Sequence, residues 1–227
     1  MTKTAFGVYL LLALLIGAGF LLTPQLILRA PIPEGGGFIQ KIFYYHVPVA
    51  WVAFLSVFVC GVGSVAFLAR RARWGEEVAN AAAELVVLFG LLVLLTGPLW
   101  ARKAWGKWWV WDARLTTTLL LWLVFVAYLM VQRYAGAAGR TLAAGLAVFG
   151  TLDVPIIWVA VSLWRTQHPK TSYVPSLGPE AKLAFFTSLA LFTLLWIALF
   201  WARLTHERNR NRLDDLHVAA AEAGMEE

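Results

Sequence analysis

Long apolar segments alternate with short polar segments along the whole chain. Six of the apolar segments are long enough to cross a bilayer and carry almost no charge. They are residues 5–28, 47–69, 78–99, 115–131, 142–163 and 183–201. Backbone polar groups in lipid must be paired within their own segment, so each segment is predicted to be an α-helix. The pattern therefore predicts an all-α, polytopic membrane protein with six transmembrane helices.

Composition supports this class and excludes others. Of the 227 residues, 60% are hydrophobic and only 14% are charged, whereas soluble domains carry about 25% charged residues. The single cysteine, Cys60, excludes an internal disulfide or a dithiol redox pair. The basic residues are scattered between apolar segments, which does not indicate nucleic-acid binding. We expect one membrane domain over residues 1–203 and a polar cytoplasmic tail over residues 204–227.

An even number of spans places both termini on one side of the membrane. The connections 29–46, 100–114 and 164–182 then share the opposite side. Basic residues divide almost evenly, ten on the side of the termini and nine on the other, so the positive-inside rule barely decides the orientation. The nine are Arg29, Lys41, Arg102, Lys103, Lys107, Arg114, Arg165, Lys170 and Lys182. If the four in or beside the connection 100–114 bind an anion, the count becomes ten to five, which predicts cytoplasmic termini.

The connection 100–114 is unusually rich in tryptophan, with the sequence AWGKWWVWDARL over residues 104–115. We predict a short interfacial helix here. Its aromatic side chains and its one acid would mostly share one stripe: Trp105, Trp108, Trp109 and Asp112, with Trp111 pointing elsewhere. An interfacial aromatic belt is the alternative, but it does not account for so compact a cluster with Lys107 and Arg114 interleaved.

Two histidines are predicted on the same side as the tryptophans. His46 precedes the second apolar segment and His168 follows the fifth, whereas His206 and His217 lie in the polar tail. Two neutral imidazoles can bind a metal axially. Zinc normally needs three or four protein ligands, but haem needs only one or two because the porphyrin supplies four nitrogens.

Haem would account for the histidines, the aromatic face and the excess positive charge together. The tryptophans could pack against the porphyrin ring. The propionates could pair with basic side chains, for which the candidates are Arg102, Lys103, Lys107 and Arg114. Asp112 could anchor Arg114 or a tryptophan N–H, or polarise one edge of the ligand, and the pattern does not choose between these roles.

Three segments carry a family resemblance. WGKWWVWDARLT (Trp105–Thr116) resembles the WWD signature of cytochrome c assembly proteins, and YHVPVAW (Tyr45–Trp51) and DVPIIWVAVSLWRTQH (Asp153–His168) resemble the histidine segments of one branch. That branch is the six-span CcmC family of haem exporter proteins. The resemblance implies that His46 and His168 are axial ligands of haem b and that residues 105–112 form the haem platform.

The resemblance also implies a role and partners. Such proteins lie in the bacterial inner membrane and present haem on the periplasmic side. They are not enzymes, and they deliver haem to a membrane-anchored chaperone of the CcmE type beside an ABC-type release complex with a small membrane subunit. Two other functions stay open: a b-type cytochrome that carries electrons, and a transporter of another amphipathic anion.

Overall fold

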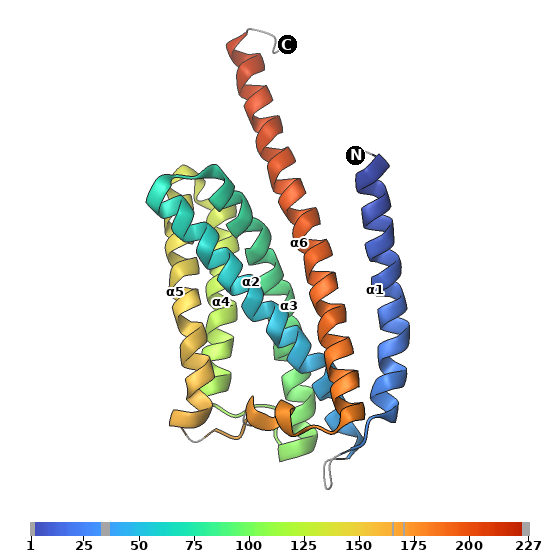
Figure 1. Cartoon of the computed structure of the whole chain (residues 1–227). Helices are drawn as coiled ribbons and strands as arrows, with labels where there is room; N and C mark the ends of the chain where they lie inside the picture. Colours follow the sequence, from blue (N-terminus) through green and yellow to red (C-terminus); the bar gives the residue numbers. More distant parts are fainter. Residues whose placement is uncertain (1–2, 33–36, 165, 170, 224–227) are drawn as a thin grey trace.

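The computed structural model describes residues 3–32, 37–164, 166–169 and 171–223, which are helical almost throughout (Figure 1). Its long helices are α1 (Lys3–Arg29), α2 (Phe43–Arg70), α3 (Arg73–Trp105), α4 (Ala113–Tyr134), α5 (Gly136–Leu163) and α6 (Pro179–Glu222). Two 3₁₀ helices, η1 (Phe38–Ile42) and η2 (Thr171–Ser176), precede α2 and α6. All six long helices are long and apolar enough to cross a membrane. The predicted all-α polytopic fold is confirmed.

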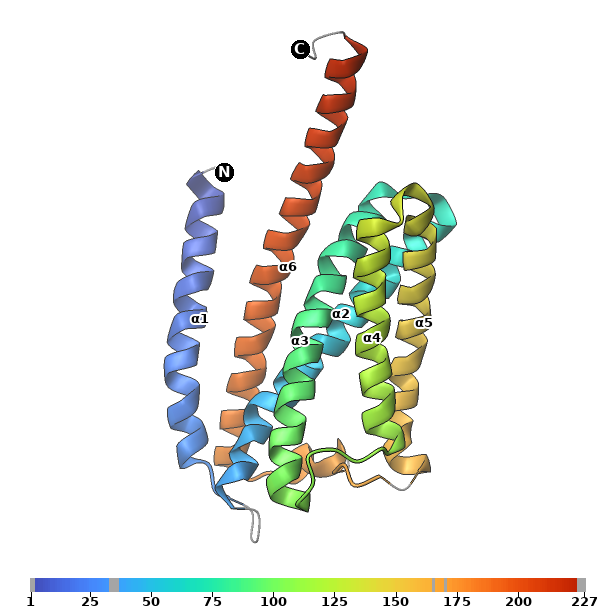
Figure 2. The same ribbon diagram turned by 180° about the vertical axis from the view of Figure 1, so that it is seen from behind.

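The helices run alternately up and down, so the connections gather at two ends. The connections after α1, α3 and α5 lie at one end, called the loop end below (Figures 1 and 2). Both chain termini and the two remaining turns lie toward the other end. The sidedness predicted from the number of spans is therefore correct. Arg165, Lys170 and the last four residues of the expected tail lie outside the described residues.

Two glycines allow α2 and α3 to approach closely beside the short turn between them. A Cβ on Gly63 would lie 2.6 Å from the carbonyl oxygen of Gly75, and the reverse distance is also 2.6 Å. The two backbones can meet here only because neither residue has a side chain. Arg71 then ends α2 with a left-handed φ of 51°. The turn is consequently only residues 71–72, whereas the predicted apolar segments leave residues 70–77 between them.

The helices form two groups joined through α2 and α3. Phe125 and Tyr128 of α4 are buried with Val57 and Val86 in a core shared by α2, α3, α4 and α5. On the other side α6 packs on α2 and α3, and α1 packs mainly on α6. Only 6% of the apolar window of α1 is buried, so most of its surface is left for lipid.

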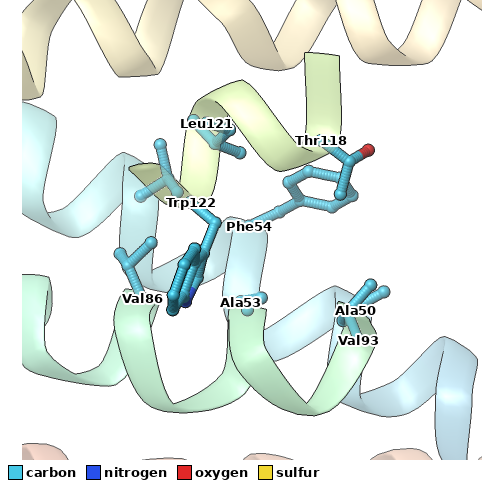
Figure 3. Close-up of a pocket in the computed structure, with 10 residues that line it drawn as sticks. Ala50, Ala53, Phe54, Val86, Val93, Thr118, Leu121 and Trp122 are labelled. Carbon is cyan, nitrogen blue, oxygen red and sulfur yellow. The ribbon is translucent and has the colours of Figure 1, made fainter. Parts of the chain in front are cut away.

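The space between α2, α3 and α4 is too small for a cofactor. Figure 3 shows this cavity, whose apolar lining includes Ala50, Phe54, Val86 and Trp122. Its volume is about 30 Å³, enough for no more than a few water molecules.

A larger cavity of about 340 Å³ lies between α2 and α5, but its lining is apolar and includes Trp51, Phe58 and Trp158. The candidate metal ligands His46 and His168 line neither cavity, so the ligand site is sought at the loop end.

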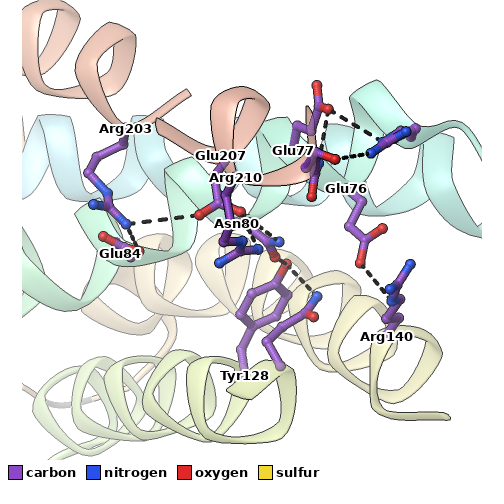
Figure 4. A network of polar contacts seen from close by, with 12 residues as sticks. Glu76, Glu77, Asn80, Glu84, Tyr128, Arg140, Arg203, Glu207 and Arg210 are labelled. Atoms are coloured by element: carbon purple, nitrogen blue, oxygen red, sulfur yellow. Dashed lines mark hydrogen bonds and ion pairs between the residues drawn. The ribbon is translucent and has the colours of Figure 1, made fainter. Parts of the chain in front are cut away.

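The polar segment after Arg203 is not a separate structural element, because α6 continues through it to Glu222. Its first turns pack on α3 through charged groups (Figure 4). Glu207 is only 2% exposed and accepts hydrogen bonds from Asn80 at 3.3 Å and Arg210 at 2.8 Å. Arg203 pairs with Glu84. The first part of this polar segment is therefore held against α3 by its charged side chains.

Candidate functional site

His46 lies in the first turns of α2, at the loop end, and is half-buried. Its Nδ1 is 2.7 Å from the hydroxyl oxygen of Thr96 on α3. That hydroxyl has one proton and lies 2.7 Å from the carbonyl oxygen of Leu92, which can only accept. With the hydroxyl donating to Leu92, its oxygen accepts from His46, and Nδ1 then carries the proton. The Nε2 atom of His46 keeps its lone pair.

His168 lies in the connection between α5 and α6 and has the same tautomer. Its Nδ1 is 2.9 Å from the carbonyl oxygen of Pro169, and a carbonyl can only accept, so Nδ1 is again the donor. Burial and the positive charge of Arg114 lower the pKa of His168 to about 4. The imidazole is thus neutral at pH 7, with Nε2 available to a metal.

The fold brings these two histidines together although they are far apart in sequence. His46 interacts electrostatically with His168, and Arg114 of α4 interacts with both. The three side chains come from α2, the α5–α6 connection and the start of α4. The two histidines, which the sequence predicted only to share one side of the membrane, therefore lie near each other.

The tryptophan segment is not the interfacial helix that the spacing predicts. Helix α3 runs on to Trp105 and stops because Gly106 adopts a left-handed φ of 73°. Residues 106–112 are irregular, and α4 begins only after Asp112. Gly106 ends α3 and Asp112 caps the start of α4, so the segment between them is too short for a separate helix. The predicted single stripe of side chains therefore does not form.

The tryptophans instead form two edge-to-face pairs. Trp105 packs on Trp100 with ring centroids 5.0 Å apart, and Trp109 packs on Trp111 at 5.7 Å. Trp108 is 58% exposed and Trp111 is 75% exposed. The Nε1–H of Trp109 is buried, and no hydrogen-bond partner for it is found in the described part of the chain. The segment thus offers open aromatic surface and an unused donor.

Asp112 connects the tryptophan segment to the histidine segment. One carboxylate oxygen accepts from the backbone N–H of Leu115 at 2.8 Å, which caps α4. The other accepts from the backbone N–H of Gln167 at 3.2 Å. Gln167 is the residue before His168. The roles that the sequence left open for Asp112 did not include this contact with the Gln167 backbone.

The four basic candidates have three different surroundings. Arg102 donates to the carbonyl oxygen of Gly106 and so closes the end of its own helix. Lys103 and Lys107 are exposed on the surface. Arg114 is half-buried, and its Nη1 is buried without a hydrogen-bond partner among the described residues. Of these four residues, Arg114 is the one that interacts electrostatically with the histidines in the described structure.

Sequence reasoning missed three groups at this site: the Thr96 hydroxyl, the Gln167 backbone N–H, and the Thr166 hydroxyl. The Thr166 oxygen is buried and has no partner among the described residues. Thr96 was visible as a hydroxyl within an apolar segment, a polar group that is expected to need a partner. The identity of that partner required the pairing of α2 with α3.

Known proteins match nearly the whole chain. A family model described as Heme exporter protein C, CcmC, matches residues 3–221. The chain is 36% identical to Heme exporter protein C of Bradyrhizobium diazoefficiens, over 85% of this chain and 75% of that protein. It is 32% identical to Heme exporter protein C of Escherichia coli K12, over 77% and 73% of the two chains.

A plant relative is matched at similar length. The chain is 30% identical to a putative cytochrome c biosynthesis ccmC-like mitochondrial protein of Arabidopsis thaliana, over 82% of this chain and 74% of that protein. The family model extends across all six spans and across both histidine segments and the tryptophan segment. With its six-span fold, this chain belongs to the heme exporter protein C family, CcmC.

Proposed function

We propose that this protein binds haem at the loop end, between His46 and His168, and hands it on for cytochrome c maturation. The observation that carries the proposal is that both imidazoles have the same tautomer. Each donates from Nδ1 to an oxygen, and each keeps Nε2 free. Histidines that bind metals almost always have their other nitrogen engaged in this way. Two such histidines suffice for haem iron.

The surrounding groups suit the rest of a haem b molecule. Propionate oxygens are acceptors, and three donors near this end are buried without partners among the described residues: Arg114 Nη1, Trp109 Nε1 and Thr166 Oγ1. Buried donors normally have partners, so these atoms support a ligand that brings acceptors. The exposed rings of Trp108 and Trp111 offer apolar surface for the porphyrin.

The loop end is proposed to face the periplasm, with both termini in the cytoplasm of a bacterial inner membrane. The basic residues of the loop end, which blur the positive-inside rule, have structural uses that support this orientation. Lys41 is 8% exposed and donates to the carbonyl oxygens of Ile27, Leu28 and Ala30 at the end of α1. Arg102 closes α3. Charges used in this way are weak topology signals.

Delivery is proposed to pass to a membrane-anchored periplasmic chaperone of the CcmE type, beside an ABC-type complex and its small membrane subunit. Exposed tryptophans and a histidine held in a connection leave one edge of the site open to such a partner. This position favours delivery over electron carriage, because an electron carrier holds its haem between helices at membrane depth. The proposed role is binding and transfer, without a change in the porphyrin.

An absorption spectrum tests the haem site. Full-length protein purified in detergent and mixed with hemin is expected to show the low-spin spectrum of two axial imidazoles. His46→Ala and His168→Ala should each convert it to a high-spin spectrum. His206→Ala and His217→Ala, at the far end of α6, are matched controls that should leave it unchanged. Wild-type spectra in both loop-end variants would overturn the ligand assignment.

Transfer kinetics separate delivery from the alternatives. Haem-loaded protein mixed with apomyoglobin should lose its haem to that acceptor. Rapid, reversible reduction by a quinol with full retention of haem would favour the electron carrier instead. Full haem affinity in the absence of both histidines would favour a carrier of another amphipathic anion.

A further inference from the structure

We infer that Asp112 is a positioning residue, which clasps the segment carrying His168 to the start of α4 so that His168 faces His46. The inference rests on the proposed haem function. It goes beyond that function because it assigns Asp112 no contact with haem. Its role is instead to complete the site from two separate connections of the loop end.

Both oxygens of the Asp112 carboxylate are already in use. Oδ1 accepts from Leu115 N at 2.8 Å and Oδ2 accepts from Gln167 N at 3.2 Å. The two donors are backbone groups of different segments, so one side chain joins two stretches of main chain. A carboxylate occupied in this way is a poor partner for iron, and its negative charge would repel a propionate.

The segment that is held needs an anchor. Residues 166–169 form neither helix nor strand, so their backbone position depends on tertiary contacts. Asp112 is itself fixed, since it caps a transmembrane helix. A hydrogen bond to Gln167 therefore fixes the backbone one residue away from His168. The Pro169 carbonyl then sets the tautomer and ring orientation of His168.

The same carboxylate also balances charge beside the ligand. Asp112 interacts electrostatically with both Arg114 and His168. Its negative charge thus acts on the guanidinium of Arg114, whose Nη1 has no hydrogen-bond partner in the described structure. Loss of Asp112 would therefore remove both the hydrogen bond to Gln167 and a negative charge beside Arg114.

Two variants of Asp112 separate clasping from capping. A serine caps a helix about as well as an aspartate, but its hydroxyl is too short to reach Gln167 as well. Asp112→Ser is therefore expected to melt near the wild-type temperature, whereas Asp112→Ala melts lower. Both should bind hemin about 10–100-fold more weakly and lose the low-spin spectrum. Added imidazole should restore that spectrum in both, as it should in His168→Ala, by filling the vacant axial position.

A second pair of variants tests the hydrogen bond itself. Gln167→Pro removes the backbone N–H that Asp112 accepts and should reproduce the spectrum of Asp112→Ser. Gln167→Ala keeps this N–H, and the Gln167 side chain is exposed, so its spectrum should match that of the wild type.

The outcomes distinguish this inference from the proposed function. Low-spin spectra and full affinity in both Asp112→Ser and Gln167→Pro, with His168→Ala impaired, would overturn the clasp and leave the haem site standing. A wild-type spectrum in His168→Ala would overturn the ligand assignment and the clasp with it. Loss in Asp112→Ser that imidazole does not restore would also overturn the clasp, because the defect would then lie outside the His168 position.

Discussion

The imidazole of His46 donates from Nδ1 to the hydroxyl of Thr96 at 2.7 Å, across the contact between α2 and α3. The hydroxyl in turn donates a hydrogen bond to the carbonyl oxygen of Leu92, one turn earlier in α3. This short chain orients the ring and keeps Nε2 unprotonated. Gly97 lies beside the ring, where a Cβ would be 3.5 Å from His46 Cε1. The side chain of the fourth residue of α2 is thus held by a neighbouring helix.

Removal of the Thr96 hydroxyl should weaken haem binding. Thr96→Val keeps the shape of the side chain but loses the acceptor, so we expect hemin affinity to fall about 10–100-fold, as for other partners of metal ligands. Titration of purified protein with hemin measures this change. Thr96→Ser retains the hydroxyl and is the control that should bind like the wild type. Equal affinities for the valine and serine variants would contradict the role of Thr96.

Ligation by His168 should persist to unusually low pH. Its pKa is lowered from 6.5 to about 4, mainly by burial and then by Arg114. Because a proton and iron compete for Nε2, ligation through this residue should be intact above pH 6.5, largely retained between 6.5 and 4, and lost as the pH falls through 4. Spectra of His46→Ala, in which His168 is the remaining ligand, report this directly. A midpoint near pH 6.5 would contradict the expectation.

The polar contacts at the opposite end should affect stability but not haem binding. Glu207→Ala leaves Asn80 and Arg210 without their shared acceptor at a site that is 2% exposed, which should cost about 1–3 kcal/mol. Asp215→Ala breaks an exposed ion pair with Arg73 of 2.8 Å and should cost less than about 1 kcal/mol. Thermal unfolding in detergent compares them. An equal loss in both variants would contradict the distinction, and weaker hemin binding would contradict the separation of the two ends.

The glycine contact between α2 and α3 should tolerate no side chain. Gly63→Ala would place a Cβ 2.6 Å from the Gly75 carbonyl oxygen, so we expect a loss of about 1–3 kcal/mol from overpacking. Gly145→Ala is the matched control in α5, where nothing lies within 4 Å of a new Cβ, and the higher helix propensity of alanine should leave stability unchanged or improved. Melting temperatures of the two variants decide whether the close approach is required.

Sequence alone was sufficient for the membrane architecture and for the grouping of the candidate site residues at one end of the helices. Six apolar segments imply six helices because lipid offers no partner to the backbone, and an even number of spans places His46, His168 and the tryptophans on one side. The prediction of an interfacial helix was wrong. Gly106 ends α3 and Asp112 caps α4, and these local signals outweighed the spacing of the aromatic residues.

Tertiary structure alone decided how the site is assembled. The hydrogen bonds from His46 to Thr96 and from Gln167 to Asp112 join residues 50 and 55 positions apart. Such hydrogen-bond partners depend on which helices pack together and on how far each helix is shifted along its axis. The hydropathy pattern contains no information about either property. The apolar pattern determined where the helices cross the membrane, because burial in lipid is a property of each segment by itself. Packing between segments determined which polar atoms meet at the loop end.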